Sequence, residues 1–174
     1  VPASNVNTIY KYNHPTKSYE YYLIENRQRT GRDVGLPDDG LAIWHVDTTG
    51  SNNNQQMTPS LHYQVTLVQA DGRWDLEHYV NSGDSTDLWA APTYRNCTPF
   101  TSPNTHWWSG SPSTLYVLGV SASGATMTFD YANMADCNAN GVGDDVDIAN
   151  GTSRDLNENV VPDECEPGDS DADG

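Results

Sequence analysis

The segment Leu41-Ala42-Ile43-Trp44-His45-Val46 is a nearly continuous apolar run, and the segment from Tyr19 to Ile24 is a second one. Turn-forming residues separate them, at Thr30-Gly31 and over Leu36-Pro37-Asp38-Asp39-Gly40. Short apolar runs between turns are typical of strands inside a sheet with both faces covered. We therefore expect these two segments to be central strands.

Two further segments alternate between apolar and polar residues. Tyr63, Val65 and Leu67 form one apolar stripe, and every other residue from Ala125 to Tyr131 forms a second. A period of two is typical of strands with one buried face. No stretch of residues 1–131 has a sustained helical period with caps, so the sequence predicts an all-β fold, arranged as an antiparallel β-sandwich.

Charge divides the chain into two parts. Of its 174 residues, 24 are acidic and 8 are basic, which gives a net charge of −16. Residues 132–174 hold 12 acids, one base (Arg154) and no aromatic residue, whereas residues 1–131 hold all 17 aromatics. We expect a β-sandwich domain over 1–131 and a separate segment over 132–174, which has too little apolar area to order itself. The acidic balance excludes nucleic acid as a partner, and no apolar run reaches the roughly 18 residues of a membrane span.

The acidic segment repeats with a period of 19 residues. Oxygen-bearing side chains recur at positions 1, 3, 5, 9 and 12 of two loops, 136–147 and 155–166, with a backbone carbonyl at position 7. This is the ligand spacing of a twelve-residue calcium loop, because Ca²⁺ takes about six to eight oxygen ligands. The predicted ligands are Asp136, Asn138, Asn140, Val142, Asp144 and Asp147 in the first loop, and Asp155, Asn157, Asn159, Val161, Asp163 and Glu166 in the second.

A third loop begins within residues 169–174, with Asp169, Asp171 and Asp173 at positions 1, 3 and 5. The given sequence stops before positions 9 and 12, so this loop closes around an ion only if a partner or a continuation completes it. We interpret the chain as a fragment of a longer protein. The alternative for the whole segment is an acidic disordered tail.

The three cysteines bear on the same segment. Cys137 and Cys165 flank the two loops, and a disulfide between them would close the loops into one unit, although three cysteines permit three pairings. Cys97 is either buried and inert or a site of intermolecular bonding. Asn96 and Asn150 each begin an Asn-x-Thr glycosylation sequon.

Several motifs of the body stand in an order found in one protein family. They are Glu20 to Gln28, Gly35-Leu36-Pro37, Gly40 to Asp47, Gln69-Ala70-Asp71-Gly72 with Asp75-Leu76, Gly83-Asp84 with Asp87, and Gly124 to Phe129. Over about residues 8–131 the chain resembles the β-rich domain that follows the catalytic domain in secreted zinc metallopeptidases of the immune inhibitor A type. Residues 136–166 are similar to dockerin-like or thrombospondin-type calcium repeats. Those repeats commonly carry four cysteines, and here Val146 and Leu156 stand where the inner pair would be.

The resemblance implies an extracellular, secreted, calcium-binding portion that packs against an upstream catalytic domain, stabilises it, and attaches to an extracellular protein or matrix. The peptidase family holds its zinc on a His-Glu-x-x-His helix, but no two of the histidines stand four apart. They are His14, His45, His62, His78 and His106. We therefore expect no enzymatic activity on this chain.

Two other functions stay open at this point. One is a carbohydrate-binding module, which would need Trp107 or Trp108 exposed on a flat face. The other is a structural protein that self-associates through Cys97 or the third loop.

Smaller groups within the body have competing interpretations. Asp71, Asp75, Asp84 and Asp87 lie within 17 residues and form either a calcium site that pins a long loop or a solvated turn. His45 with Asp47 suggests a metal site or an acid–base pair, but a packed histidine with a satisfied hydrogen bond is favoured. Glu25 and Arg27 share one strand face and predict an ion pair, and the tryptophans are expected to be core residues.

Overall fold

The computed structural model describes residues 9–51, 57–133, 138, 140, 142–156 and 162–165. Within these residues the strands are β1 (Tyr10–Asn13), β2 (Glu20–Arg27), β3 (Gly40–Asp47), β4 (Val65–Leu67), β5 (Leu115–Leu118) and β6 (Asp130–Asn133). The helical elements are short: η1 (Gly31–Asp33) and η2 (Asp163–Cys165) are 3-10 helices, and α1 (Asp144–Asn150) is an α-helix. All strand pairs are antiparallel, so the all-β prediction is confirmed.

Strands β1 to β4 form one sheet in sequence order. In β3 every residue except Trp44 is buried, which confirms a central strand with both faces covered. In β2, by contrast, Glu20, Tyr22 and Ile24 are buried and the residues between them are half-buried. The prediction of full cover was wrong for β2, because it lies between β3 and the short β1 and only one of its faces meets the core.

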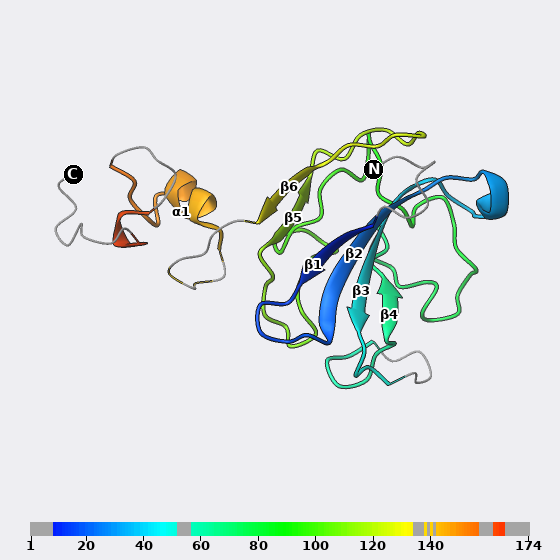
Figure 1. Cartoon of the computed structure of the whole chain (residues 1–174), viewed down its shortest axis with the longest axis horizontal. Coiled ribbons are helices and arrows are strands. Elements are labelled where there is room, and N and C mark those ends of the chain that lie inside the picture. The colour runs from blue at the N-terminus through cyan, green and yellow to red at the C-terminus, as the bar shows by residue number, and fades with distance from the viewer. Residues whose placement is uncertain are drawn as a thin grey trace.

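The second sheet consists of β5 and β6 (Figure 1). Leu115 and Val117 of β5 belong to the same core as Tyr22 and Ile43 of the first sheet, so the core lies between the two sheets. Cys97 joins it from a loop that pairs with β5 through a single bridge to Val117. Burial of this apolar area is the main favourable term in folding. The second sheet has only two strands among the described residues, so the sandwich arrangement stays a prediction.

The predicted stripe from Ala125 to Tyr131 is only partly a strand, because β6 starts at Asp130. Met127 is fully buried, as the alternation predicts, whereas both ends of the stripe are exposed. The cause is a local turn: Ser121 N–H donates to the carbonyl of Thr128 at 2.9 Å, so these residues close a loop instead of joining the ladder.

Beyond β6, the described part of the acidic segment is a short helix and a 3-10 turn set apart from the sheets (Figure 1). α1 ends at Asn150 and is capped by Gly151, which has φ 72° and donates its N–H to the carbonyl of Asp147. Glycine takes this left-handed conformation at no steric cost. Asp163 N–H donates to the carbonyl of Arg154 at 2.8 Å and joins η2 to the segment after α1. The predicted boundary after residue 131 falls inside β6, which ends at Asn133. No helix in the described ranges is long and apolar enough to cross a membrane.

Candidate metal centres

The first predicted calcium loop converges on one carboxylate. Asp147, at position 12, is only 1% exposed. The Nδ2 groups of Asn138 and Asn140, at positions 3 and 5, donate to its Oδ2 at 3.2 and 2.8 Å, and Thr152 donates to its Oδ1 at 2.8 Å. Burial alone would raise the pKa of Asp147, but these hydrogen bonds outweigh it and lower the pKa, so the carboxylate is ionised at neutral pH. Three predicted positions of the loop therefore meet at one point.

The remaining described positions of this loop follow the same course. Asn138 Oδ1 accepts the N–H of Asn140 at 3.1 Å, and Asn140 Oδ1 accepts the N–H of Val142, at position 7, at 2.7 Å. Asp144, at position 9, is the first residue of α1 and is 3% exposed. The loop thus leads directly into a helix, an element that the sequence did not predict.

The second loop presents a buried carboxylate of its own. Asp163, at position 9, is 5% exposed; its Oδ1 accepts the N–H of Leu156 at 2.9 Å, and its Oδ2 has no hydrogen-bond partner within the described residues. Asp155, at position 1, is half-buried. The two loops touch, because Asn138 Nδ2 lies 3.5 Å from Oε1 of Glu164 in η2. The other predicted ligands lie outside the described residues: Asp136, Asn157, Asn159, Val161, Glu166, Asp169, Asp171 and Asp173.

The cysteines and sequons are placed as follows. Cys165 is disulfide-bonded, but Cys137 lies outside the described residues, so they contain no complete disulfide and the predicted pairing stays a prediction. Cys97 is a free thiol, fully buried, and burial raises its pKa well above the usual range. This favours the inert alternative for Cys97. Asn96 and Asn150 are both exposed, as a glycosylated residue must be.

A second acidic cluster lies in the body. Carboxylate oxygens of Asp71, Asp75 and Asp84 lie within 4.8 Å of one another. Asn81 Nδ2 donates to Asp84 at 3.1 Å and lies 3.4 Å from Asp75, and the Thr86 hydroxyl lies 2.8 Å from Asp71 and 2.5 Å from Asp84. Three like charges this close repel one another, and neutral donors offset that repulsion only in part. Asn81 and Thr86 were not predicted as members of this cluster, although both stand inside the 17-residue segment.

Asp87, the fourth predicted member, is not part of that group of atoms. It is 3% exposed, its Oδ2 accepts the N–H of Asp84 at 2.7 Å, and its Oδ1 has no hydrogen-bond partner in the described part of the chain. Burial raises the pKa of Asp87, and the charges of Asp84 and Asp71 raise it further. A buried carboxylate of this kind is costly unless a proton or a cation neutralises it.

The cluster is held against β4 by two buried polar side chains. Glu77 accepts the N–H of Leu67 at 3.2 Å and the Nε2–H of Gln69 at 2.5 Å. Gln69 Oε1 in turn accepts the N–H of Asp75 at 2.9 Å. The position of β4 therefore fixes the position of Asp75.

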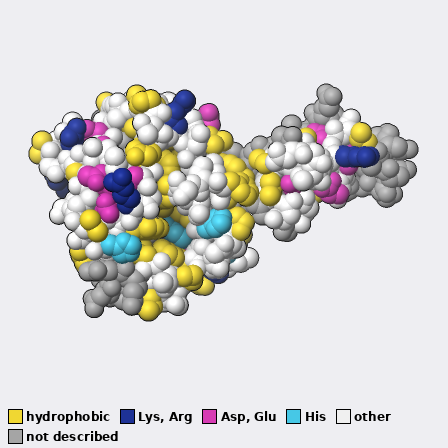
Figure 2. All heavy atoms as spheres, turned by 180° about the vertical axis from the view of Figure 1, so that it is seen from behind, with side chains coloured by type: hydrophobic (Ala, Val, Ile, Leu, Met, Phe, Trp, Pro, Cys, Tyr) yellow, Lys and Arg dark blue, Asp and Glu magenta, His cyan; other side chains and the backbone are white. Residues whose placement is uncertain are grey.

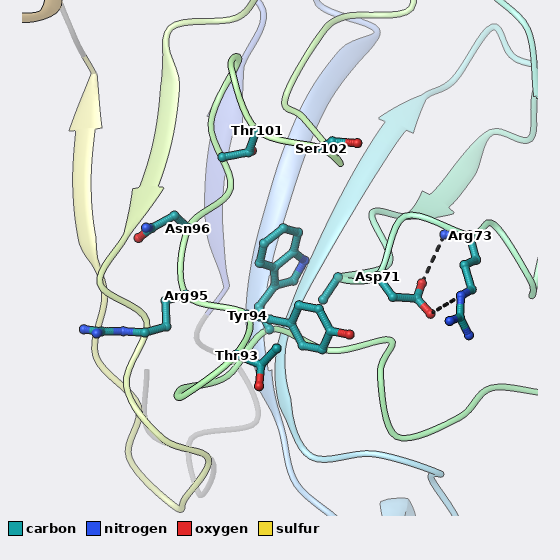
Figure 3. A pocket seen from close by; sticks show the side chains of 10 residues that line it. Asp71, Arg73, Thr93, Tyr94, Arg95, Asn96, Thr101 and Ser102 are labelled. Carbon is teal, nitrogen blue, oxygen red and sulfur yellow. Dashed lines mark hydrogen bonds and ion pairs between the residues drawn. The ribbon is translucent and has the colours of Figure 1, made fainter.

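Asp71 also lines an open cleft of about 610 Å³ (Figure 3). Arg73 lies beside it, with Nε 3.4 Å from Oδ2 of Asp71 and the backbone N–H donating to Oδ1 at 3.1 Å. The Arg73 side chain is 65% exposed, so this ion pair is open to solvent. In Figure 3, Asn96 lies across the cleft and points away from Asp71.

His45 and Asp47 do not pair with each other. His45 Nε2 lies 3.1 Å from Oε1 of Glu20, and His62 Nε2 lies 3.2 Å from Oδ2 of Asp47. All four side chains are buried. Burial lowers the pKa of His45, so a neutral imidazole donates its Nε2–H to the ionised Glu20 at pH 7. The interpretation of His45 as a packed residue with a satisfied hydrogen bond is confirmed.

Two smaller predictions can also be checked. Arg27 Nη1 lies 3.4 Å from Oε1 of Glu25, which confirms the ion pair on β2. Core burial is confirmed for Trp89 and Trp107, which are 2% and 5% exposed, whereas Trp44, Trp74 and Trp108 are half-buried.

Comparison of the chain with protein families, curated proteins and solved structures finds no match.

Proposed function

We propose that this chain is the calcium-binding, non-catalytic C-terminal portion of a secreted metallopeptidase-like protein. The proposal is carried by the burial of Asp144, Asp147 and Asp163, each at most 5% exposed, in a segment whose only base is Arg154. An ionised carboxylate leaves water only when donors or positive charge replace the water. With twelve acids against one base, the segment has little positive charge of its own, and a cation from solution would supply what the hydrogen-bond donors do not.

Calcium suits the donors that the first loop offers. Asn138, Asn140 and Asp147 meet at the spacing of a twelve-residue calcium loop, and all three can present oxygen, which a hard cation prefers to nitrogen or sulfur. The Asn amide groups supply Asp147 with a partial positive charge that Ca²⁺ would supply in full. Extracellular modules bind Ca²⁺ with dissociation constants of roughly 10⁻⁴–10⁻³ M, which suits a secreted protein.

The body cluster supports a second site. Asp71, Asp75 and Asp84 already lie within 4.8 Å of one another, and Asp87 adds a buried carboxylate oxygen that has no partner within the described ranges. Ca²⁺ at the triad would cancel the repulsion among the three and lower the cost of ionising Asp87. It would also fasten the segment between β4 and residue 87 to the sheet.

These sites support a structural role. The body would form a β-sandwich that packs against a catalytic domain and stabilises it, and the acidic segment would be a compact calcium unit closed by a disulfide between Cys137 and Cys165. The unit would provide a rigid extracellular attachment to a protein or matrix partner. Catalysis would belong to the upstream part of the parent protein.

Calorimetric titration of the chelator-stripped chain with CaCl₂, with circular dichroism before and after, tests the proposal. We expect two or more ions to bind and the acidic segment to gain order. Asp136→Ala and Asp147→Ala should each lose one ion while the body stays folded, and Asp33→Asn, a half-buried position on η1 outside both loops, should leave the stoichiometry unchanged. Absence of binding, or unchanged stoichiometry in both loop variants, would show that the first loop is not a calcium site.

A further inference from the structure

Three of the five tryptophans line one small pocket in the body. Trp74, Trp107 and Trp108 share it with His45, His106 and Asn104, and its volume is about 190 Å³. On the side seen in Figure 2, histidine side chains lie among hydrophobic ones on the β-rich body. The pocket is well below the roughly 300–1,000 Å³ of sites for drug-sized ligands, so it has room for a single ring or a single side chain.

Buried carboxyl groups hold this pocket in shape. Glu20, 1% exposed, accepts the backbone N–H of Trp108 at 2.6 Å and the Nε2–H of His45 at 3.1 Å, so one carboxylate orients two lining residues. The Trp108 ring stacks on His62 with ring centroids 4.0 Å apart, and the His62 ring is hydrogen-bonded to the carboxyl group of Asp47. Burying two carboxylates to position one indole and its neighbours is costly, and such support is typical of preorganised sites.

Two further features concern the residues that line the pocket, Trp74 and His106. Trp74 has φ 59°, in the left-handed region that bulky residues avoid, and strained residues of this kind cluster at ligand sites. A hydrogen bond joins the loop that carries His106 to β2, because the Tyr22 hydroxyl donates to the carbonyl of His106 at 2.6 Å. The Trp74 and Trp108 rings lie side by side, with centroids 6.3 Å apart and planes tilted by 38°, and the fold itself holds this aromatic wall.

The polar groups at the pocket are amide and imidazole groups. Its lining contains no Asp, Glu, Lys or Arg, although the chain carries a net charge of −16. Asn104 uses Oδ1 to accept the N–H of His106 at 3.0 Å, and neither its Nδ2 nor the His106 ring has a hydrogen bond within the described residues. A neutral ligand with apolar faces and hydroxyl groups matches indole walls with an amide and an imidazole at the rim.

We propose that this pocket binds one sugar ring of a neutral polysaccharide. The C–H faces of the ring would pack on Trp74 and Trp108, and its hydroxyl groups would bond to Asn104 and His106. This is a different mode from a flat aromatic platform, which Trp107 cannot provide because it is 5% exposed. The proposal does not depend on the calcium sites, since no carboxylate lines the pocket.

Calorimetric titration of the calcium-loaded chain with cellohexaose, chitohexaose and xylohexaose tests the proposal. We expect one of them to bind, and Asn104→Ala and His106→Ala each to weaken binding about tenfold through one lost hydrogen bond. His78→Ala, an exposed histidine outside the pocket, should bind as the parent does. Trp74→Phe, which shortens one wall, should also weaken binding, while Trp44→Phe outside the pocket should not.

Several results would overturn the proposal. Absence of binding to all three saccharides would do so, as would binding that survives in both rim variants. Tighter binding of benzyltrimethylammonium, or of a proline-rich peptide, would assign the pocket to cations or to peptides instead. Equal circular dichroism spectra of the variants and the parent would show that any loss is local to the pocket.

Discussion

Replacing Glu20 with glutamine keeps the shape of the side chain and removes its charge. In the folded chain, Glu20 Oε1 accepts the N–H of Trp108 and the Nε2–H of His45, and Oε2 lies 3.4 Å from Nζ of Lys17. Burial alone would raise the pKa of Glu20, but the hydrogen bonds from His45 and Trp108 and the charge of Lys17 outweigh it and lower the pKa from 4.5 to about 2.

A lowered pKa fixes the sign of the pH dependence. Ionised Glu20 stabilises the fold above pH 4.5, and that stabilisation is lost as the pH falls from 4.5 towards 2. One pKa unit corresponds to about 1.4 kcal/mol, so the contribution at neutral pH is about 3 kcal/mol. The pKa of His45 is also lowered, so its protonation destabilises the fold as the pH falls below 6.5, a higher range than that of Glu20.

Urea unfolding followed by tryptophan fluorescence, at neutral pH and at about pH 2, measures this contribution. At neutral pH we expect Glu20→Gln to be about 2–3 kcal/mol less stable than the parent, because the charged acceptor is lost. At about pH 2 the difference should shrink to less than half, since about half of the parent carboxylates are then protonated in the folded chain and nearly all in the unfolded chain. A difference between Glu20→Gln and the parent that stays constant with pH would refute the reasoning.

Three further predictions concern single residues. Cys97 should resist a thiol reagent such as dithionitrobenzoate in the native chain and react fully in guanidinium, because it is fully buried and its pKa is raised; rapid native labelling would contradict this. Gly40→Ala should lower the free energy of unfolding in urea by about 1–3 kcal/mol, since the added Cβ would lie 2.8 Å from the carbonyl oxygen of Trp89. Gly35→Ala, where no atom lies within 4 Å of the added Cβ, should lower it by less than about 0.5 kcal/mol. Equal losses of stability would show that the close approach at Gly40 does not matter. Asp75→Asn should weaken calcium binding at the body cluster roughly tenfold in calorimetry, because one of three charged ligands is lost, and an unchanged isotherm would show that the triad holds no ion.

The local patterns predicted the fold class well and the covered faces less well. The run from Leu41 to Val46 is apolar at nearly every position, and β3 is indeed buried on both faces. The run from Tyr19 to Ile24 has a similar composition, yet β2 has one core face and one half-buried face. Composition does not reveal which neighbours a strand will have, and that decides how its second face is covered.

Long-range partners had no signal in the sequence. Glu20 and His45 are separated by 25 residues, and only the antiparallel register of β2 and β3 brings them together. The spacing His45-x-Asp47 instead suggested a pair that the structure does not contain. The candidate calcium ligands were easier, because the twelve-residue loop is local: Asn138, Asn140 and Asp147 meet where their spacing predicts. The helix that follows them, α1, has few apolar residues, and its N-cap residue Gly143 makes no side-chain cap hydrogen bond. The start of this helix therefore had no signal in the sequence.

The two halves of the chain stabilise buried carboxylates in different ways. In the body, buried Glu20 and Asp47 each have an imidazole partner, and this partner is part of the fold. In the acidic segment, Asp147 and Asp163 are as deeply buried, yet residues 132–174 supply a single base, Arg154, whose side chain is exposed. A chelator should therefore unfold the acidic segment without touching the imidazole–carboxylate pairs of the body. Acid should act on both, because protons neutralise Glu20 and the proposed calcium ligands alike.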